Sequence, residues 1–194
     1  GCINTVVYWG QREDTGEPWA DGSPHPIGQG GSFYGDGATC LHHAESATRF
    51  APTEVWENRN PWLVNRIELI QDSCGAGEHR GGLGVNLEIE MLEDTFATTV
   101  CERTELSPWG LNKGKEGLAN NCFLINDKGE KKSIPKATRV SIKKGSKVLI
   151  QNGGGGGYGS PSERKKEKVL DDYKQQYISR EYIKAVSYTH LTLP

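Results

Sequence analysis

The two residues best suited to chemistry in this sequence are a carboxylate and a guanidinium that flank a glycine-rich turn. Asp72 and Arg80 are separated by Ser-Cys-Gly-Ala-Gly-Glu-His, and Gly81 and Gly82 follow directly. A carboxylate and a guanidinium placed this way could orient an anionic substrate, or could simply pair with each other. We favour structural pairing, and we keep Asp72, Arg80, Gly81 and Gly82 as candidate substrate-binding residues.

Two adjacent histidines, His42 and His43, are the weak candidates for a metal site. In a strand they would point to opposite faces, so they could not easily bind one ion together. One of them could act with Asp36 or Glu45, but exposed or hydrogen-bonded loop histidines are the simpler interpretation. The sequence therefore assigns no metal site.

The cysteines form no recognisable site. The five Cys are widely spaced without a CxxC pair, which favours reduced thiols in the cytoplasm over disulfides or bound zinc. Cys74 lies in the turn after Asp72 and would need a nearby base to act as a nucleophile. We expect instead a small buried side chain at this position.

A run of glycines from Gly153 to Gly157 precedes Tyr158 and Gly159. Its backbone N–H groups could bind an anion, but no Gly-Lys-Ser/Thr follows, so the run is not a nucleotide P-loop. Tight packing of backbone against a neighbouring strand is the interpretation that we favour, with ligand contact as the alternative.

The elements that must position these residues are mainly strands. Alternating or β-branched patterns predict strands over residues 63–70, 85–91, 95–100 and 122–125, and residues 140–142 and 147–150 flank a Lys-Gly-Ser turn like a hairpin. Residues 11–40 are typical of long loops. A helix is predicted near residues 162–174, starting at Pro161, and a second short one is capped by Ser179. We therefore predict a mainly β, α+β fold, either a sandwich or a barrel, with long glycine-rich loops and a small C-terminal helical segment.

Composition agrees with this fold class. The 194 residues include 25 Gly but one Met and four Phe, and glycine favours turns over helices. The formal net charge is -2, yet residues 128–168 hold 12 Lys and Arg against 3 Asp and Glu. We interpret this basic block as solvated strands and turns, since no nucleic-acid module is recognisable. No segment is long and apolar enough for a membrane span, so we expect neither a nucleic-acid nor a membrane partner.

Both ends of the chain have unusual features. The first residue is Gly1, and residues 186–194 look like a translated sequencing adaptor, so we leave that tail out of the fold. We expect residues 1–185 to be a fragment of a larger fold. In that case apolar side chains such as Trp19, Trp56 and Trp62 would lose part of their cover.

Several short motifs, taken in order, resemble one known family. They are Glu54-Val-Trp-Glu57 with Asn60-Pro-Trp62, Asp72-Ser-Cys-Gly-Ala-Gly77, Arg80-Gly-Gly-Leu-Gly84, Glu102-Arg103, Pro108-Trp-Gly-Leu111, and Gly153 to Gly159 with Pro161 and Glu163-Arg164. Together they resemble the C-terminal part of hydantoinase B/oxoprolinase proteins, which include N-methylhydantoinase B and are related to the acetone carboxylase α subunit. The chain departs from the family pattern at Cys74, Lys113 and Ser160.

The resemblance implies a fragment of the B-type chain of an ATP-dependent hydrolase that opens hydantoins or 5-oxoproline. It implies a small cyclic amide as substrate and a hydantoinase A-type subunit or domain that binds ATP and Mg²⁺. Any divalent metal would be held mainly by residues upstream of this chain. Phosphorylation of the amide oxygen would remove the amide resonance and make phosphate the leaving group. No catalytic residue is assigned, and the fragment alone would be inactive.

Two alternatives stay open at this point. The chain could belong to the α subunit of an acetone- or acetophenone-type carboxylase. It could also be a non-catalytic scaffold and subunit-interface module.

Overall fold

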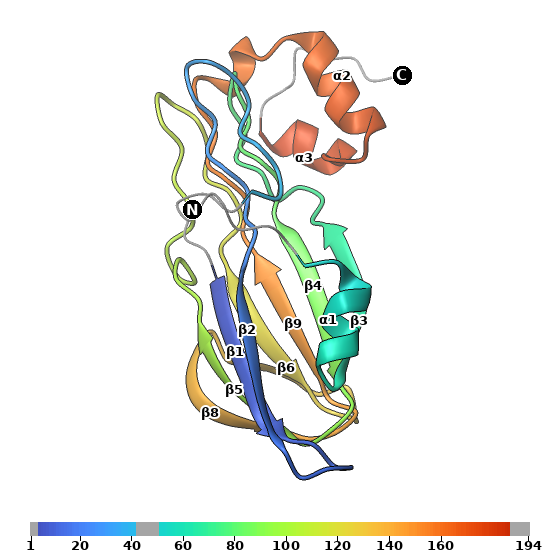
Figure 1. Cartoon of the computed structure of the whole chain (residues 1–194). Helices are drawn as coiled ribbons and strands as arrows, with labels where there is room; N and C mark the ends of the chain where they lie inside the picture. Colours follow the sequence, from blue (N-terminus) through green and yellow to red (C-terminus); the bar gives the residue numbers. More distant parts are fainter. Residues whose placement is uncertain (1–3, 42–50, 187–194) are drawn as a thin grey trace.

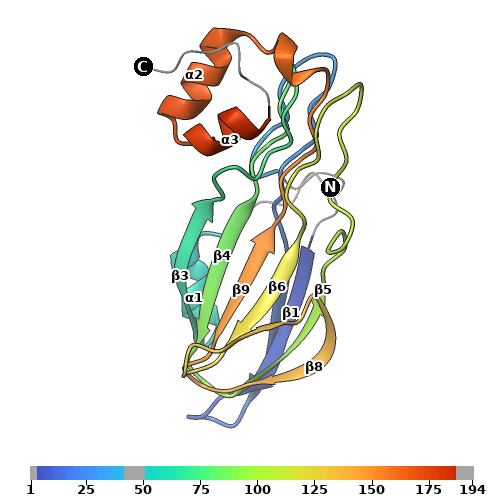
Figure 2. The same ribbon diagram turned by 180° about the vertical axis from the view of Figure 1, so that it is seen from behind.

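The computed structural model describes residues 4–41 and 51–186, which form two antiparallel sheets packed face to face (Figures 1 and 2). The four-stranded sheet has the order β2-β1-β5-β8, and the five-stranded sheet has the order β3-β4-β9-β6-β7. The strands are β1 Asn4–Gln11, β2 Pro18–His25, β3 Trp62–Leu69, β4 Val85–Met91, β5 Thr95–Val100, β6 Asn121–Ile125, β7 Lys131–Ser133, β8 Lys136–Ile142 and β9 Lys147–Asn152. The prediction of a mainly β fold is confirmed, and its form is a sandwich.

Alternation of apolar and polar residues explains the best-predicted strand. In β4 the side chains of Val85, Leu87, Ile89 and Met91 are buried, while the residues between them are partly exposed. Successive side chains of a strand point to opposite faces, so the buried set faces the other sheet and forms part of the core. The strands predicted at residues 63–70, 95–100 and 122–125 are likewise confirmed as β3, β5 and β6.

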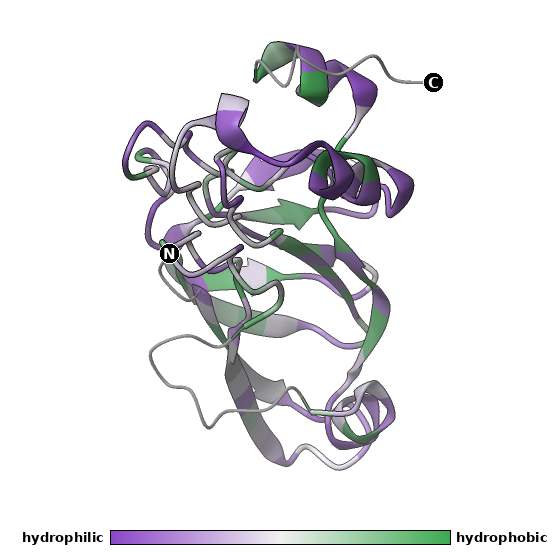
Figure 3. Cartoon of the chain, turned by 90° about the horizontal axis from the view of Figure 1, so that it is seen from above, coloured by the Kyte–Doolittle hydropathy of each residue, from purple (hydrophilic) through white to green (hydrophobic). Residues whose placement is uncertain are grey.

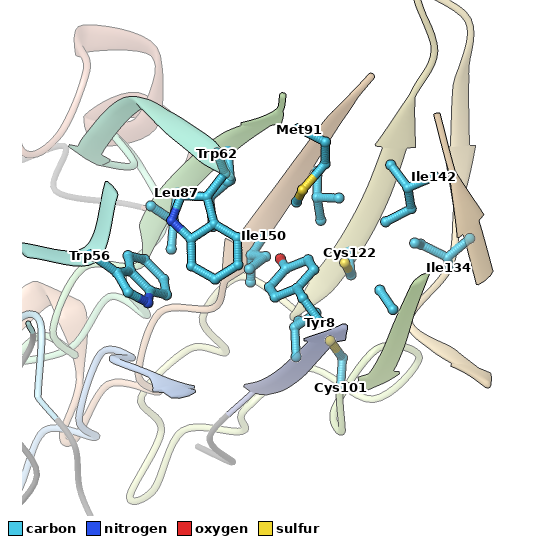
Figure 4. Packing of buried hydrophobic residues seen from close by; sticks show 14 residues of the cluster. Tyr8, Trp56, Trp62, Leu87, Met91, Cys101, Cys122, Ile134, Ile142 and Ile150 are labelled. Carbon is cyan, nitrogen blue, oxygen red and sulfur yellow. The ribbon is translucent and has the colours of Figure 1, made fainter. Parts of the chain in front are cut away.

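Aromatic side chains close one side of the core (Figure 4). The rings of Trp56 and Trp62 meet edge to face with centroids 5.2 Å apart, and Trp19 meets Trp62 in the same way at 5.7 Å. Trp62 is fully buried and Trp56 is 5% exposed. The expectation that these tryptophans lose their cover is therefore wrong for Trp56 and Trp62, because they cover each other and pack on the two sheets.

Three features near the N-terminal half differ from the prediction. Residues 11–40 contain the strand β2, although the sequence suggests loops. Proline cannot donate to a ladder but is tolerated on an edge strand, and β2, which begins at Pro18, is such an edge. Strand β1 and helix α1 (Thr53–Arg59) were not expected either. The seven residues of α1 bury one side chain, Trp56, which is too little for a helical period to show.

The predicted hairpin of residues 140–150 is wrong. β8 pairs with β5, whereas β9 pairs with β4 and β6 in the other sheet. The Lys-Gly-Ser turn therefore carries the chain from one sheet to the other. Two hydrogen bonds hold this crossing: the Lys144 N–H donates to the side-chain Oδ1 of Asp94 at 3.0 Å, and the Gly145 N–H donates to the Met91 carbonyl at 2.8 Å.

The C-terminal helical segment is confirmed, with a later start. Pro161 begins a short 3₁₀ turn, η1 (Pro161–Glu163), and two extended residues separate it from α2 (Lys166–Lys174). Ser179 caps helix α3 (Arg180–Ala185) as predicted, because its side chain accepts a hydrogen bond from the Tyr182 N–H. Val186, the first residue of the adaptor-like tail, is the C-cap of α3 and packs against the hydrophobic residues of the helical segment.

Long glycine-rich loops extend from one end of the sandwich, and the C-terminal helices pack beside them (Figures 1 and 3). A second core joins the two parts, with Cys74, Ala76 and Leu83 from the loops and Val169, Ile178 and Ile183 from the helical segment. Every helix in the described part of the chain is too short or too polar to cross a bilayer.

Candidate functional site

The glycine-rich loops form a bundle of chain segments packed backbone against backbone. The run Gly153 to Gly157 is its central segment, and a Cβ atom on any of its last four glycines would lie about 2 Å from a neighbouring carbonyl oxygen. Those oxygens, with distances from the ideal Cβ position, are Ser73 O at 1.9 Å, Gln29 O at 1.9 Å, Trp109 O at 2.0 Å and Ala76 O at 2.1 Å. The favoured interpretation of this run, tight backbone packing, is confirmed.

Gly81 and Gly82 belong to the same bundle. A Cβ on Gly81 would lie 1.9 Å from the Gly155 oxygen, and one on Gly82 would lie 1.9 Å from the Ala38 oxygen. The Gly82 N–H donates to the Gln29 carbonyl at 2.7 Å. Packing alone therefore requires glycine at both positions, while their role in substrate binding stays a prediction.

An ionic cluster joins the loop bundle to the C-terminal helices; the side chains of Arg80, Arg164 and Asp172 are largely buried in it, and that of Asp36 is 25% exposed. Arg164 forms ion pairs of 2.7 Å with both Asp36 and Asp172, and Arg80 forms one of 2.9 Å with Asp172. Lys168 approaches Asp36 at 3.5 Å, and the Arg80 guanidinium lies over the ring of Tyr177, 5.3 Å from its centroid. The cluster therefore links the loops, the segment after η1, and α2 through charge-assisted hydrogen bonds.

The predicted pairing of Asp72 with Arg80 is wrong, because each side chain has another partner. The Asp72 carboxylate accepts a hydrogen bond of 2.6 Å from the Ser179 N–H, and the Asp72 N–H donates to the Tyr177 carbonyl. Asp72 thereby holds the connection between α2 and α3, whereas Arg80 pairs with Asp172 on α2. No sequence motif indicates this partner, because Asp172 lies 92 positions beyond Arg80.

The environment shifts the pKa values of Asp36 and Cys74, among other groups of this region. Burial opposes ionisation of Asp36, but hydrogen bonds from Arg164 and the charges of Arg164, Lys168 and Arg80 hold its pKa below the usual 3.8. Burial raises the pKa of the Cys74 thiol to about 11. The thiol is therefore protonated near neutral pH, as expected for a small buried side chain rather than a nucleophile.

The histidine candidates cannot be placed in this site. His42 and His43 lie outside the described residues. Among the residues that the structure does describe, no group of three His, Cys, Asp or Glu is arranged to hold a metal ion.

Apart from Arg164, which is buried in the ionic cluster, the basic block is mainly a set of exposed or partly exposed side chains. Lys136, Lys143 and Lys144 pair with Glu102, Asp94 and Glu13, respectively, and all of these side chains are more than half exposed. Lys131 and Lys132 lie on the short edge strand β7, where lysine discourages pairing with another strand.

A small hollow of about 200 Å³ opens on the loop bundle, among Gly30, Gly31, Arg103, Trp109 and Gly156 with their neighbours. The Arg103 guanidinium lies 4.1 Å from the centroid of the Trp109 ring. Both residues stand in motifs of the sequence, but neither motif assigns them a role in a site.

Comparison with known proteins gives a consistent result. The family described as hydantoinase B/oxoprolinase matches residues 1–161. A protein of Pseudomonas sp. (strain NS671), named as the putative B-type chain of a D-/L-hydantoinase, is 32% identical over 183 residues, which are 93% of this chain and 31% of that protein.

Solved structures share the fold. The ATP-dependent caprolactamase from Pseudomonas jessenii superposes with a TM-score of 0.82 and 25% identity over 98% of this chain and 34% of that one. Acetone carboxylase in its nucleotide-free form superposes with a TM-score of 0.80 at 17% identity, over 94% of this chain and 29% of that one. The present chain thus spans about a third of the length of each of these proteins.

Proposed function

The chain belongs to the hydantoinase B/oxoprolinase family, and from this premise we propose that it is part of the B-type chain of an ATP-dependent enzyme that opens small cyclic amides. The observation that carries the proposal is the superposition on the caprolactamase, an enzyme described as ATP-dependent, over 98% of this chain. The relative named as a chain of a hydantoinase supports the same class of substrate.

ATP and Mg²⁺ are assigned to a partner subunit or domain of the hydantoinase A type. The glycine run offers no free phosphate cradle, because the N–H groups of Gly153, Gly155 and Gly157 already donate to Asn120 Oδ1, the Gly82 carbonyl and the Lys115 carbonyl. ATP would supply the phosphoryl group that activates the amide oxygen. The described residues include no group of ligands that fits a divalent metal. The proposal therefore gives this chain no role in metal binding.

The domain in this proposal keeps the predicted range, residues 1–185, with Val186 packed at its end. The second hydrophobic core and the Arg164 ion pairs tie the C-terminal helices to the loops. We therefore treat the helical segment as part of the same domain.

A specific observation favours the scaffold alternative for this part of the enzyme. Asp72, Arg80, Gly81 and Gly82 all have structural contacts that explain their identity. Their proposed contact with substrate is tested by the variants D72A and R80A in the intact enzyme. Substrate binding predicts a raised KM at an unchanged melting temperature, whereas a scaffold role predicts a lowered melting temperature with an unchanged KM for the folded fraction.

The function itself is tested by product analysis. The chain with its partner is supplied with ATP and either a lactam or hydantoin, or with a ketone and bicarbonate. In the first case we expect ADP, phosphate and the ring-opened product, which is an amino acid from a lactam and an N-carbamoyl amino acid from a hydantoin. A carboxylated ketone in the second case, without ring opening in the first, would instead identify an acetone-type carboxylase.

We also propose a cytoplasmic location. The support is the set of free thiols at Cys40, Cys74, Cys101 and Cys122, since reduced cysteines are typical of that compartment.

A further inference from the structure

Two glycines of the same loop, Gly30 and Gly35, are not explained by packing, and of these two Gly30 lines the hollow. A Cβ on Gly28, Gly31, Gly155 or Gly156 would come within 2.4 Å of a backbone atom. At Gly30 the nearest atom to a Cβ is the Gly156 oxygen at 3.6 Å, an ordinary contact, and its φ lies outside the left-handed region. A side chain would thus fit the backbone at Gly30, and the space that it would occupy adjoins the hollow that Gly30 lines.

The hollow has the size of a site for one small ring. Its volume is about 200 Å³, below the 300–1,000 Å³ usual for drug-sized ligands. Gly30, Gly31, Gly156 and Gly157 contribute backbone to its wall, and Trp109 and Leu111 contribute apolar side chains. Trp109 is 61% exposed despite lying on a tightly packed bundle.

Charge at the hollow is positive. Arg103 lines it, and its guanidinium lies against the Trp109 ring, 4.1 Å from the centroid. Within the described part of the chain, no carboxylate lies within ion-pair distance of Arg103, in contrast to the paired Arg80 and Arg164. Arg103 also has a positive φ of 56°, a conformation that costs a residue with a side chain free energy. A cation without an acidic partner beside an exposed indole fits a planar ligand that carries an anionic group.

We propose that this hollow binds a small cyclic amide bearing a carboxylate, with the ring beside Trp109 and Gly30 and the carboxylate on Arg103. The identity of the ligand rests on the proposed function, whereas the hollow and its charge do not. Glycine backbone at the wall lets the ring approach closely, and Arg103 selects the anion.

The test measures binding to the full chain without ATP, by titration calorimetry and by the change in tryptophan fluorescence that W109F removes. Two ligands are compared, 5-oxoprolinate and 2-pyrrolidone, which share the lactam ring and differ in the carboxylate. We expect tighter binding of 5-oxoprolinate by at least tenfold, and we expect R103Q to abolish this preference.

Gly30 provides the sharper variant. G30V should fill the hollow, lower the affinity for 5-oxoprolinate at least tenfold and leave the melting temperature unchanged. Gly35, in the same loop with no atom within 4 Å of a Cβ, supplies the control G35A, which should bind like the wild type. Equal affinity of G30V and wild type, no preference for the carboxylate, or no binding at all would each overturn the site.

The site and the proposed function can fail separately. Ring opening by the complex with a KM that G30V does not alter would leave the function and remove the site. Binding that depends on Gly30 and Arg103, in a complex that opens no lactam, would leave the site and remove the function.

Discussion

Arg164 and Asp172 form a 2.7 Å ion pair in which the two side chains are 1% and 8% exposed. Asp172 lies on α2, and Arg164 precedes that helix and also binds Asp36 in the loop bundle. Two charges taken out of water must be matched closely, or their desolvation outweighs their attraction. The helical segment is therefore fixed in one position relative to the loops by contacts that tolerate little movement.

Removal of Asp172 should destabilise the chain strongly. The variant D172N leaves Arg164 and Arg80 with one carboxylate, Asp36, between them. Breaking a buried pair by deleting one partner costs about 3–5 kcal/mol, a large part of the roughly 5–15 kcal/mol that stabilises a domain. Urea denaturation measures the loss.

An exposed pair serves as the control for this prediction. Lys143 and Asp94 are in contact at 2.5 Å, but their side chains are 74% and 57% exposed. D94N should lower the free energy of unfolding far less than D172N does, because an exposed ion pair contributes little to stability. If D172N and D94N lowered the free energy of unfolding equally, burial of the ionic cluster would contribute nothing to stability.

Asp36 should make the stability depend on acidic pH. Its pKa is lowered from 3.8 because, against the opposing effect of burial, Arg164, Lys168 and Arg80 favour the carboxylate. A group whose pKa is lower in the folded state stabilises above its unfolded pKa and loses this contribution as pH falls through the folded value. The wild type should therefore exceed D36N in free energy of unfolding near neutral pH, and the difference should shrink as the pH falls below 3.8 and through the lower folded-state pKa of Asp36.

The measurement is denaturation of wild type and D36N across that pH range. Asp127, an exposed carboxylate between β6 and β7, provides the control variant D127N. A difference between wild type and D36N that stays constant from pH 7 to pH 2.5 would contradict the assignment to Asp36.

The elements that were predicted correctly from the sequence are those defined by patterns of neighbouring residues. The alternation from Val85 to Met91 and the cap at Ser179 act within a few residues of the elements that they define. The pairing of strands is not local, which is why a hairpin-like turn at Gly145 instead joins two sheets. A strand that starts at Pro18 is tolerated because it lies at the edge of its sheet. That position is known only once the whole sheet is assembled.

The ionic cluster could not be predicted either, because its members are also far apart in sequence. Asp36 and Arg164 are 128 positions apart in sequence, so nothing near either residue indicates the other. The run Gly153 to Gly157 did indicate close packing or ligand contact. Close packing applies, because a Cβ on Gly155 would lie 1.9 Å from a neighbouring carbonyl oxygen, and only the assembled bundle reveals that distance.

Gly155 should tolerate no side chain. A Cβ there would lie 1.9 Å from the Gln29 oxygen and 2.3 Å from its carbonyl carbon, and backbone atoms of a packed bundle cannot move aside. Overpacking of a core costs about 1–3 kcal/mol and occasionally more, so we expect G155A to lose at least about 3 kcal/mol or to fail to fold. Denaturation of G155A alongside G35A, where a Cβ meets nothing, measures this. A wild-type melting curve for G155A would refute the packing.

The described thiols should differ sharply in reactivity. Cys74 is 2% exposed, and burial raises its pKa to about 11, so little thiolate forms at pH 8 and a reagent cannot reach it. Cys40 is exposed, although partial burial raises its pKa as well. Iodoacetamide at pH 8 should label Cys40 in the native chain and leave Cys74 unmodified, with both labelled in urea. Peptide mass spectrometry resolves the sites, and rapid native labelling of Cys74 would mean that the second hydrophobic core opens readily and that the helical segment is not held as the structure indicates.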